Sequence, residues 1–393
     1  MQRFSFLLCC LALTAMPLRA SACGGCFGPT GQPTQVTAHR MAVMFGAEST
    51  TLWDQFEYTG APEDFVWVLP VAGDQDVQIE LSSNNFFTSL TSATAITLQA
   101  PFRSTGGGGG GGFGCSGAAP LSSEAGGAQS TVTIYGQEVV GPYEAVTLGP
   151  EDPDALVTWL QDNGYGVPTD MLPVIESYVE SGMNFVALRL SPDETVDRMQ
   201  PVRITTPGIN TAFPLRMVGA GVVGSVALEL FVLGEGRYEA ANFDNLEVPR
   251  EQLVYDYATA SFNYDTLAQA VLDESAGGGW LTEVAIPLDP AALASVVTAD
   301  GETLNAMEDS GFVLSTLGRS VYVTRMRAEL PRDALREDLV LMASSGNDFL
   351  GNRIQVENDV NFGSPPSSEG NSLPVLVLML LAGAVGYKRK FMF

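Results

Sequence analysis

Two apolar segments, one near each end of the chain, confine any globular fold to the residues between them. The first covers residues 4–18, follows the basic Arg3 and precedes the small residues Ala20 and Ala22. A basic start, an apolar stretch and an A-x-A step are the order of a secretory signal. The sequence therefore predicts a signal peptide over residues 1–22 that is cleaved after Ala22.

Cys23 leaves a second interpretation of this start open. It directly follows the predicted cleavage point, so it could carry a lipid after processing. Lipoprotein signals usually have Leu where this chain has Ala20, which favours the first interpretation. Both interpretations place the body of the chain outside the cytoplasm.

The second apolar segment, residues 373–387, is short for a membrane-spanning helix. At about 1.5 Å of rise per residue it covers roughly 22 Å of a hydrocarbon core of about 30 Å. A Ser/Pro-rich linker over residues 363–372 precedes it and a basic tail over residues 388–393 follows it. This arrangement predicts a hydrophobic anchor helix with a cytoplasmic C-terminus, so the membrane is a predicted partner. A buried core helix and a trimmed sorting segment are the alternatives.

The body between these ends is strongly acidic and contains no lysine. It holds 14 arginines against 45 acidic residues, a net charge of −31, because both lysines lie in the C-terminal tail. Such a surface repels nucleic acid, so we expect no nucleic-acid partner. A body without lysine excludes a Walker-type phosphate lysine, a Schiff-base lysine and a kinase lysine.

A change of composition marks the internal boundaries of the body. Residues 103–130 are dominated by Gly, Ser and Ala and include seven consecutive glycines. This predicts a flexible surface insertion between a β-rich N-terminal part, residues 23–102, and the main part, residues 131–362. The sequence leaves open whether the insertion joins two domains or is a long loop within one.

The body alternates short strands and short helices without a strict βαβ rhythm. Residues 65–71 are apolar at nearly every position, which predicts a central strand. The predicted helices cover residues 82–95, 152–163, 169–182, 264–275 and 289–301, and a strand is predicted over residues 212–218. We predict an α+β fold of mixed, mostly antiparallel β-sheets with several short packed helices, plus one C-terminal hydrophobic helix.

Several strings that occur in order over about residues 23–341 resemble the bacterial domain of unknown function 2330 family. They are GAPEDFVWVLPV, VGPYEAVTL followed by ALVTWLQDNGYGVP, YVESGMNFVALRLSP and YVTRMRAELPRDALREDLVL. The start CGGCFGPTGQP is similar to that of family members. His39 departs from the family pattern, which has an acidic residue before the arginine at position 40, and the glycine run is similar to an insertion. The resemblance implies an exported envelope protein and supplies no catalytic residue.

The cysteines and the single histidine offer one metal-site candidate. Cys23, Cys26, His39 and Cys115 together could form a zinc set of three cysteines and one histidine. An oxidising compartment favours disulfides instead, with Cys23, Cys26 and Cys115 as candidates. If Cys23 is lipidated, Cys26 and Cys115 remain as a pair. We therefore predict no metal and no other cofactor.

Two further motifs have ordinary structural explanations. Residues 219–224 match the G-x-G-x-x-G pattern of dinucleotide sites, but the residues that follow predict a strand where that site needs a helix. Glu63 and Asp64, near Trp67, form an acidic pair beside an aromatic residue. Neighbouring side chains on an extended chain point to opposite faces, so this pair cannot flank one glycosidic bond by itself.

The remaining polar candidates are expected to be structural. His39 is predicted to lie on a strand at a sheet edge. Arg325 and Arg327 share one face of a predicted strand, and we expect them to pair with Glu337 or Asp338. The sequence identifies no catalytic residue.

Two classes of function remain open. The first is a non-enzymatic, membrane-anchored envelope protein whose ectodomain binds or scaffolds an unknown extracytoplasmic partner. The alternative is a carboxylate-based hydrolase of an envelope polymer, which needs two carboxyl groups about 5 to 9.5 Å apart in an open cleft.

Overall fold

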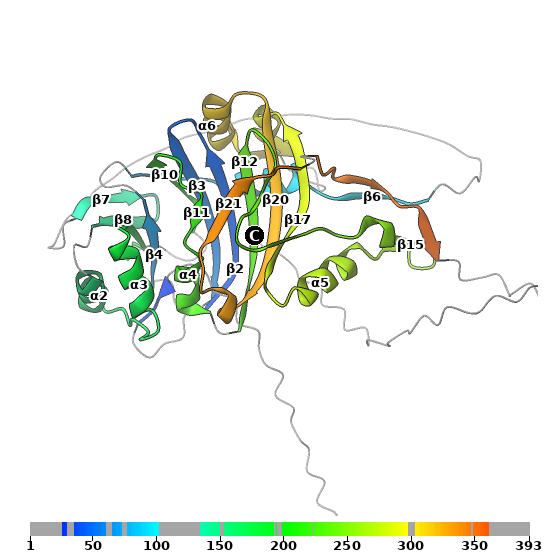
Figure 1. Cartoon of the computed structure of the whole chain (residues 1–393). Helices are drawn as coiled ribbons and strands as arrows, with labels where there is room; N and C mark the ends of the chain where they lie inside the picture. Colours follow the sequence, from blue (N-terminus) through cyan, green and yellow to red (C-terminus); the bar gives the residue numbers. More distant parts are fainter. Residues whose placement is uncertain are drawn as a thin grey trace, which may run out of the picture.

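An eight-stranded sheet forms the centre of the molecule (Figure 1). The structure is a computed structural model that describes residues 26–29, 35–59, 65–72, 77–101, 134–149, 153–191, 194, 199–222, 224–297, 303–346 and 349–360. The strand order of the large sheet is β14-β17-β20-β12-β2-β3-β10-β5. In chain order these strands are β2 (Gln35–Phe45), β3 (Ser49–Thr59), β5 (Gln78–Leu81), β10 (Val202–Pro207), β12 (Ser225–Gly234), β14 (Asp244–Leu246), β17 (Gly279–Leu288) and β20 (Val321–Pro331).

Both parts of the body contribute strands to this sheet. β2, β3 and β5 precede residues 103–130, and the other five strands follow them. The parallel ladder between β2 and β12 and the antiparallel ladders of β10 with β3 and β5 join the two sets. The described residues on either side of the insertion therefore share one sheet.

A five-stranded antiparallel sheet covers part of one face of the large sheet. Its order is β1 (Cys26–Phe27), β4 (Val66–Val71), β9 (Asn184–Leu190), β8 (Tyr143–Leu148) and β7 (Ile134–Val140). In β4, Trp67 and Leu69 face the core between the sheets, while Val66 and Val68 face a second core against helices α2 (Pro153–Asp162) and α3 (Leu172–Glu180). All six residues of β4 are buried, which confirms the predicted strand with two apolar faces.

A smaller sheet extends this cover over the middle of the large sheet. It consists of β11 (Ala212–Phe213), β21 (Leu339–Ala343) and β13 (Tyr238–Ala240). Leu339 and Leu341 of β21 lie in the same core as Leu228 and Leu230 of β12. Short helical turns link this sheet to the large one: α4 (Leu215–Val218) and η3 (Gly219–Gly221) lie between β11 and β12, and η6 (Arg332–Ala334) lies between β20 and β21.

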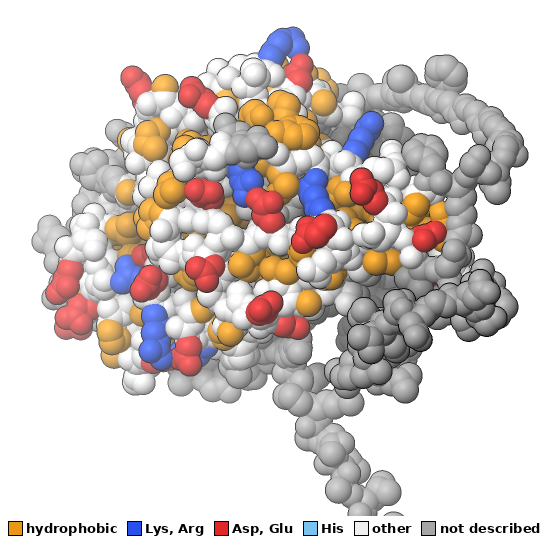
Figure 2. Space-filling view, turned by 45° about the vertical axis from the view of Figure 1, so that its right-hand side comes forward, with side chains coloured by type: hydrophobic (Ala, Val, Ile, Leu, Met, Phe, Trp, Pro, Cys, Tyr) orange, Lys and Arg blue, Asp and Glu red, His pale blue; other side chains and the backbone are white. Residues whose placement is uncertain are grey.

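Helices and short strands cover the opposite face in two groups. The first contains α1 (Asn84–Ala93), η5 (Pro290–Leu293), α6 (Met307–Leu317) and the pair β18 (Ser295–Val297) and β19 (Thr303–Asn305). The second contains α5 (Tyr264–Glu274), η4 (Arg250–Gln252), the pair β6 (Thr97–Gln99) and β22 (Arg353–Gln355), and the sheet β16 (Ser261–Phe262), β15 (Val254–Asp256) and β23 (Asn358–Val360). Figure 2 shows acidic and basic side chains interspersed with apolar ones on the surface it presents.

The mixed α+β class with mostly antiparallel sheets is confirmed, and two local predictions were wrong. The predicted helix over residues 289–301 is only the turn η5, followed by strand β18, because Val296 and Val297 favour an extended chain. The predicted strand over residues 212–218 ends at Phe213, and α4 begins after Pro214. No helix among the described residues is long and apolar enough to cross a membrane; the segment 373–387 lies outside them.

A buried ion pair fixes the start of α6 on the large sheet. The carboxylate of Asp309 is 2% exposed and accepts hydrogen bonds from Trp53 Nε1 at 2.8 Å, Ser82 Oγ at 2.8 Å and Arg203 Nη1 at 3.0 Å. The Arg203 guanidinium also lies 4.3 Å from the centre of the Phe312 ring. Three strands of the sheet or their flanking residues thus bind one helix residue.

Removing the charge of Asp309 should lower the free energy of unfolding more than removing the charge of Glu308. The Asp309→Asn substitution leaves Arg203 with only the more exposed carboxylates of Glu80 and Glu308. We expect a loss of about 1.5–3 kcal/mol in the free energy of unfolding, the range for a hydrogen bond to a charged group. The matched control is Glu308→Gln, because Glu308 is 77% exposed and pairs with the same arginine; it should change stability by less than about 1 kcal/mol. Urea denaturation measures both, and equal effects would contradict the assignment.

Candidate functional site

A row of paired charges crosses the helix-covered face of the large sheet. The sheet register brings Arg40 of β2 beside Glu229 of β12. Arg40 Nε lies 2.8 Å from Glu229 Oε2, and Arg325 Nη2 of β20 lies 2.7 Å from Glu229 Oε1. Glu283 of β17 then lies within 3.4 Å of Arg325 Nε and 3.3 Å of Arg327 Nε. Each carboxylate thus contacts two arginines, as expected for a structural network.

This network corrects the predicted partners of Arg325 and Arg327. Asp338 instead accepts hydrogen bonds from the guanidinium of Arg216 at 2.8 and 3.1 Å, and Tyr178 donates to it at 2.5 Å. Asp338 precedes β21 on one face of the large sheet, whereas the two arginines project from the other face. Residues near in sequence are therefore separated by the sheet itself.

Burial and neighbouring charges perturb the groups of these clusters in consistent directions. Desolvation and the Asp338 carboxylate raise the pKa of Tyr178, so its hydroxyl remains a proton donor. The hydrogen bond to Asp338 raises the pKa of Arg216. Desolvation and the charge of Glu283 raise the pKa of Tyr264, whose hydroxyl donates to Glu283 at 3.3 Å. Tyr178, Arg216 and Tyr264 therefore keep their protons, which suits a role as hydrogen-bond donors in the structure more than a role in proton transfer.

The glycine motif at residues 219–224 binds an arginine and lacks the geometry of a dinucleotide site. The order along the chain is α4, η3 and then β12, the reverse of the strand, glycine loop and helix that a phosphate cradle needs. Arg332 Nη1 donates to the carbonyl oxygens of Gly219 at 2.8 Å and Val222 at 2.6 Å. Two carbonyl oxygens of this loop thus accept hydrogen bonds from the Arg332 guanidinium, and the glycine motif has a structural role.

His39 lies in the centre of the large sheet, which corrects its predicted edge position. Its strand β2 is paired on one side with β3 and on the other with β12. His39 Nε2 and Asp54 Oδ1 lie 2.5 Å apart in the core between the sheets, and both side chains are 2% exposed. His39 Nδ1 makes no hydrogen bond with any described residue. With so little of either side chain exposed, the pair does not form an open active site.

The predicted zinc and disulfide residues are only partly within the described chain. Cys26 is 6% exposed in β1, opposite Trp67 of β4. Cys23 and Cys115 lie outside the described residues, so their pairing stays a prediction. Within the described ranges, no three side chains of His, Cys, Asp or Glu are placed to hold a metal ion. Trp67 is fully buried and offers no surface for a sugar.

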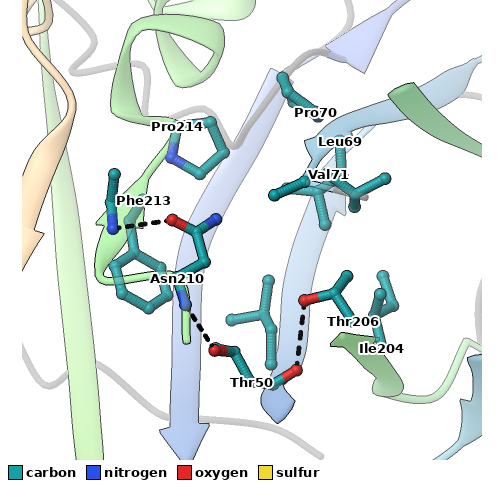
Figure 3. A pocket seen from close by; sticks show the side chains of 12 residues that line it. Thr50, Leu69, Pro70, Val71, Ile204, Thr206, Asn210, Phe213 and Pro214 are labelled. Carbon is teal, nitrogen blue, oxygen red and sulfur yellow. Dashed lines mark hydrogen bonds between the residues drawn. The ribbon is translucent and has the colours of Figure 1, made fainter. Parts of the chain in front are cut away.

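An open pocket lies between the two main sheets, at the end of the sandwich where β3, β4 and β10 meet (Figure 3). Its wall is formed by apolar and uncharged polar side chains: Thr50, Leu52, Leu69, Pro70, Val71, Ala72, Ile204, Thr206, Asn210, Ala212, Phe213 and Pro214. The volume of its cavity is about 40 Å³. That is room for roughly three waters, or for one small organic group.

The polar groups of the pocket are arranged around Thr50. Asn210 N–H donates to Thr50 Oγ1 at 2.8 Å, and Thr50 Oγ1 donates to the carbonyl of Gly208 at 2.9 Å. Asn210 Oδ1 accepts from the amide of Ala212 at 3.1 Å, which orients its Nδ2 as the remaining donor. The described residues that line the pocket thus combine apolar walls with one amide donor, and none of them carries a carboxylate. No motif of the sequence predicts this pocket, because its residues come from distant segments of the chain.

Comparison with known proteins identifies the family of the chain and adds no site. Residues 17–342 match the model of a family described as uncharacterized protein conserved in bacteria, DUF2330. The chain belongs to this family. No significant match was found among curated proteins or among solved structures. The predicted DUF2330 resemblance is confirmed, and because the family is uncharacterized, the site has to be argued from the structure alone.

The His39–Asp54 pair can be tested as a structural unit. The His39→Leu substitution leaves Asp54 buried and unpaired, and we expect it to cost about 3–5 kcal/mol in the free energy of unfolding. The double substitution His39→Leu with Asp54→Val removes both polar groups and should recover most of that loss. Thermal or urea unfolding of the two variants decides; a double variant as unstable as the single one would argue against the pairing.

Proposed function

We propose that this protein is an exported cell-envelope protein, held at the membrane by residues 373–387, whose body binds a small uncharged group of an extracytoplasmic partner. The observation that carries the binding part is the lining of the pocket between the sheets. Apolar walls with a few placed hydrogen-bonding groups are typical of sites that bind, and none of the described lining residues carries a carboxylate, imidazole, amine or thiol that could act as an acid or a base.

The location rests on the sequence of the two ends. The apolar residues 4–18 with the following A-x-A step, and the apolar residues 373–387 with their basic tail, support export and anchoring. An oxidising compartment would then also support a disulfide between Cys26 and either Cys23 or Cys115.

The group that fits the pocket has an apolar part and an oxygen acceptor. Leu52, Val71 and Ile204 offer apolar contact, and Asn210 Nδ2 offers a donor. A charged ligand would lose its hydration without finding a partner charge, which costs several kcal/mol. The carboxylate-based hydrolase draws no support from this pocket.

Export and anchoring predict a defined mature chain in the membrane fraction. Intact-mass measurement of the protein from fractionated cells should give a chain that begins at Cys23, retains residues 373–393 and is released by detergent but not by high salt. Replacing residues 373–387 with a Gly/Ser linker of equal length is the matched control, and it should move the protein to the soluble envelope fraction. A chain found in the cytoplasm with residues 1–22 present would refute the proposal.

The binding part predicts selectivity for a neutral ligand. We expect 1-butanol to shift the methyl NMR signals of Leu52, Val71 and Ile204, and butyrate to shift them much less, since the pocket offers no cation. Ala212→Phe fills the pocket and should abolish the response, whereas Ala292→Phe, at an exposed position of η5, should leave it unchanged. Equal responses to both probes, or an unchanged response in Ala212→Phe, would contradict a neutral binding site.

A further inference from the structure

The described chain ends at one well-defined edge of the molecule. β23 runs parallel to β15, and Val360, its last residue, lies opposite Asp256, the last residue of β15. β15 turns into the antiparallel β16 through residues 257–260. The last described residue therefore lies beside this turn, on the side of the molecule away from α2 (Figure 1). We call this part of the molecule the exit edge.

This exit point is fixed to the body. Asn358 Nδ2 donates to the carbonyls of Glu251 at 2.9 Å and Leu253 at 3.2 Å. Ile354 and Val356, just before β23, are buried against Leu272 of α5 in the same apolar cluster. Hydrogen bonds and apolar packing thus hold the end of the described chain against β15 and α5.

The distance from the exit to the apolar segment is limited by chain length. Residues 361–372 separate Val360 from the segment 373–387. A fully extended chain covers at most about 3.3–3.6 Å per residue, so this linker reaches about 40 Å. If residues 373–387 lie in a bilayer, as the proposed function requires, Val360 can lie no more than about 40 Å from it.

Half-buried aromatic side chains gather at this edge. The ring of Tyr255 lies 4.7 Å from that of Tyr257 and 4.8 Å from that of Phe262, between ring centres. The Tyr257 hydroxyl donates to the carbonyl of Pro101 at 2.8 Å, which fixes the ring in place. Aromatic side chains with one apolar and one polar end are favoured at the boundary between lipid and water.

The charged side chains at the same edge are acidic, and they favour zwitterionic over anionic headgroups. Asp256 and Asp359 lie on adjacent strands, and Glu357 directly precedes β23. Hydrogen bonds from the amide of Ala258 and the hydroxyl of Thr259 lower the pKa of Asp256, so this carboxylate stays ionised near neutral pH. Anionic headgroups would repel this edge, whereas zwitterionic headgroups would not.

We propose that the edge formed by β15, β16, β23 and the turn at residues 257–260 faces the bilayer and contacts a zwitterionic membrane surface. This orientation rests on the proposed anchor. It presents the pocket between the main sheets to the side and leaves the α2 end pointing away from the membrane.

Tryptophan quenching by brominated lipids tests the orientation in the full mature chain. Ala258→Trp places a reporter in the turn, and Gln161→Trp places a matched exposed reporter on α2. Trp53, Trp67 and Trp280 are fully buried. The fourth tryptophan, Trp159, is half-buried on α2 beside Gln161, so it is replaced by Phe in both reporter variants, which leaves the introduced tryptophan as the only accessible one among the described residues. In nanodiscs of phosphatidylcholine brominated near the headgroup, we expect about twofold or more quenching of the Ala258→Trp reporter relative to Gln161→Trp. Adding phosphatidylglycerol should reduce the difference, and salt should restore it.

The outcomes separate this proposal from the proposed anchor. A chain that does not stay with the nanodiscs refutes the anchor itself. A chain that stays, with equal quenching of both reporters, refutes the orientation alone. Stronger quenching of Ala258→Trp with anionic lipid would refute the selection of a zwitterionic surface. Unfolding curves of both variants that match the parent show that each reporter sits on an intact fold.

Discussion

The parallel pairing of β2 with β12 is the contact on which the rest of the structure depends. It joins strands from either side of the glycine-rich insertion, and both cores of the large sheet are built across it. On the helix-covered face the pairing places Arg40 beside Glu229, from which the charged row continues to Arg325. On the other face the antiparallel register of β2 with β3 places His39 next to Asp54 in the core. The two ladders of β2 thus set the polar contacts of both faces.

The buried polar groups give the layers their relative positions. Apolar side chains alone tolerate sliding and repacking, whereas a buried charge is stable only opposite its partner. Asp309 holds α6, Asp338 joins α3 and α4 to the start of β21, and Arg332 holds the glycine loop before β12. These contacts fix the segment that carries Asn210 and Phe213, and so the shape of the pocket beside β4. The shape of the candidate site thus depends on the polar contacts that hold the layers together.

Local features were predictable from the sequence, and features that depend on distant residues were not. The apolar pattern of residues 65–71 identified β4. The predicted helix over residues 289–301 does begin with a helical turn, η5, which Asp289 caps. It ends there because the following valines form β18 and pair with β19. His39 was placed at an edge because no local signal shows that β12 will pair with β2. The pocket was invisible for the same reason, since Thr50, Val71 and Asn210 meet only in the folded sandwich.

The β2–β12 ladder also determines how this chain can fold. Arg40 and Glu229 are 189 residues apart, so β2 and β3 leave the ribosome long before the strand that completes their sheet. Contacts of such sequence separation form slowly, because a long loop must close before they give any stability. Until β12 arrives, one edge of β2 exposes unpaired backbone groups, which is a surface for aggregation. A chain with this topology profits from staying unfolded until its synthesis is complete, which is the state in which secretion through a narrow channel requires a protein to be.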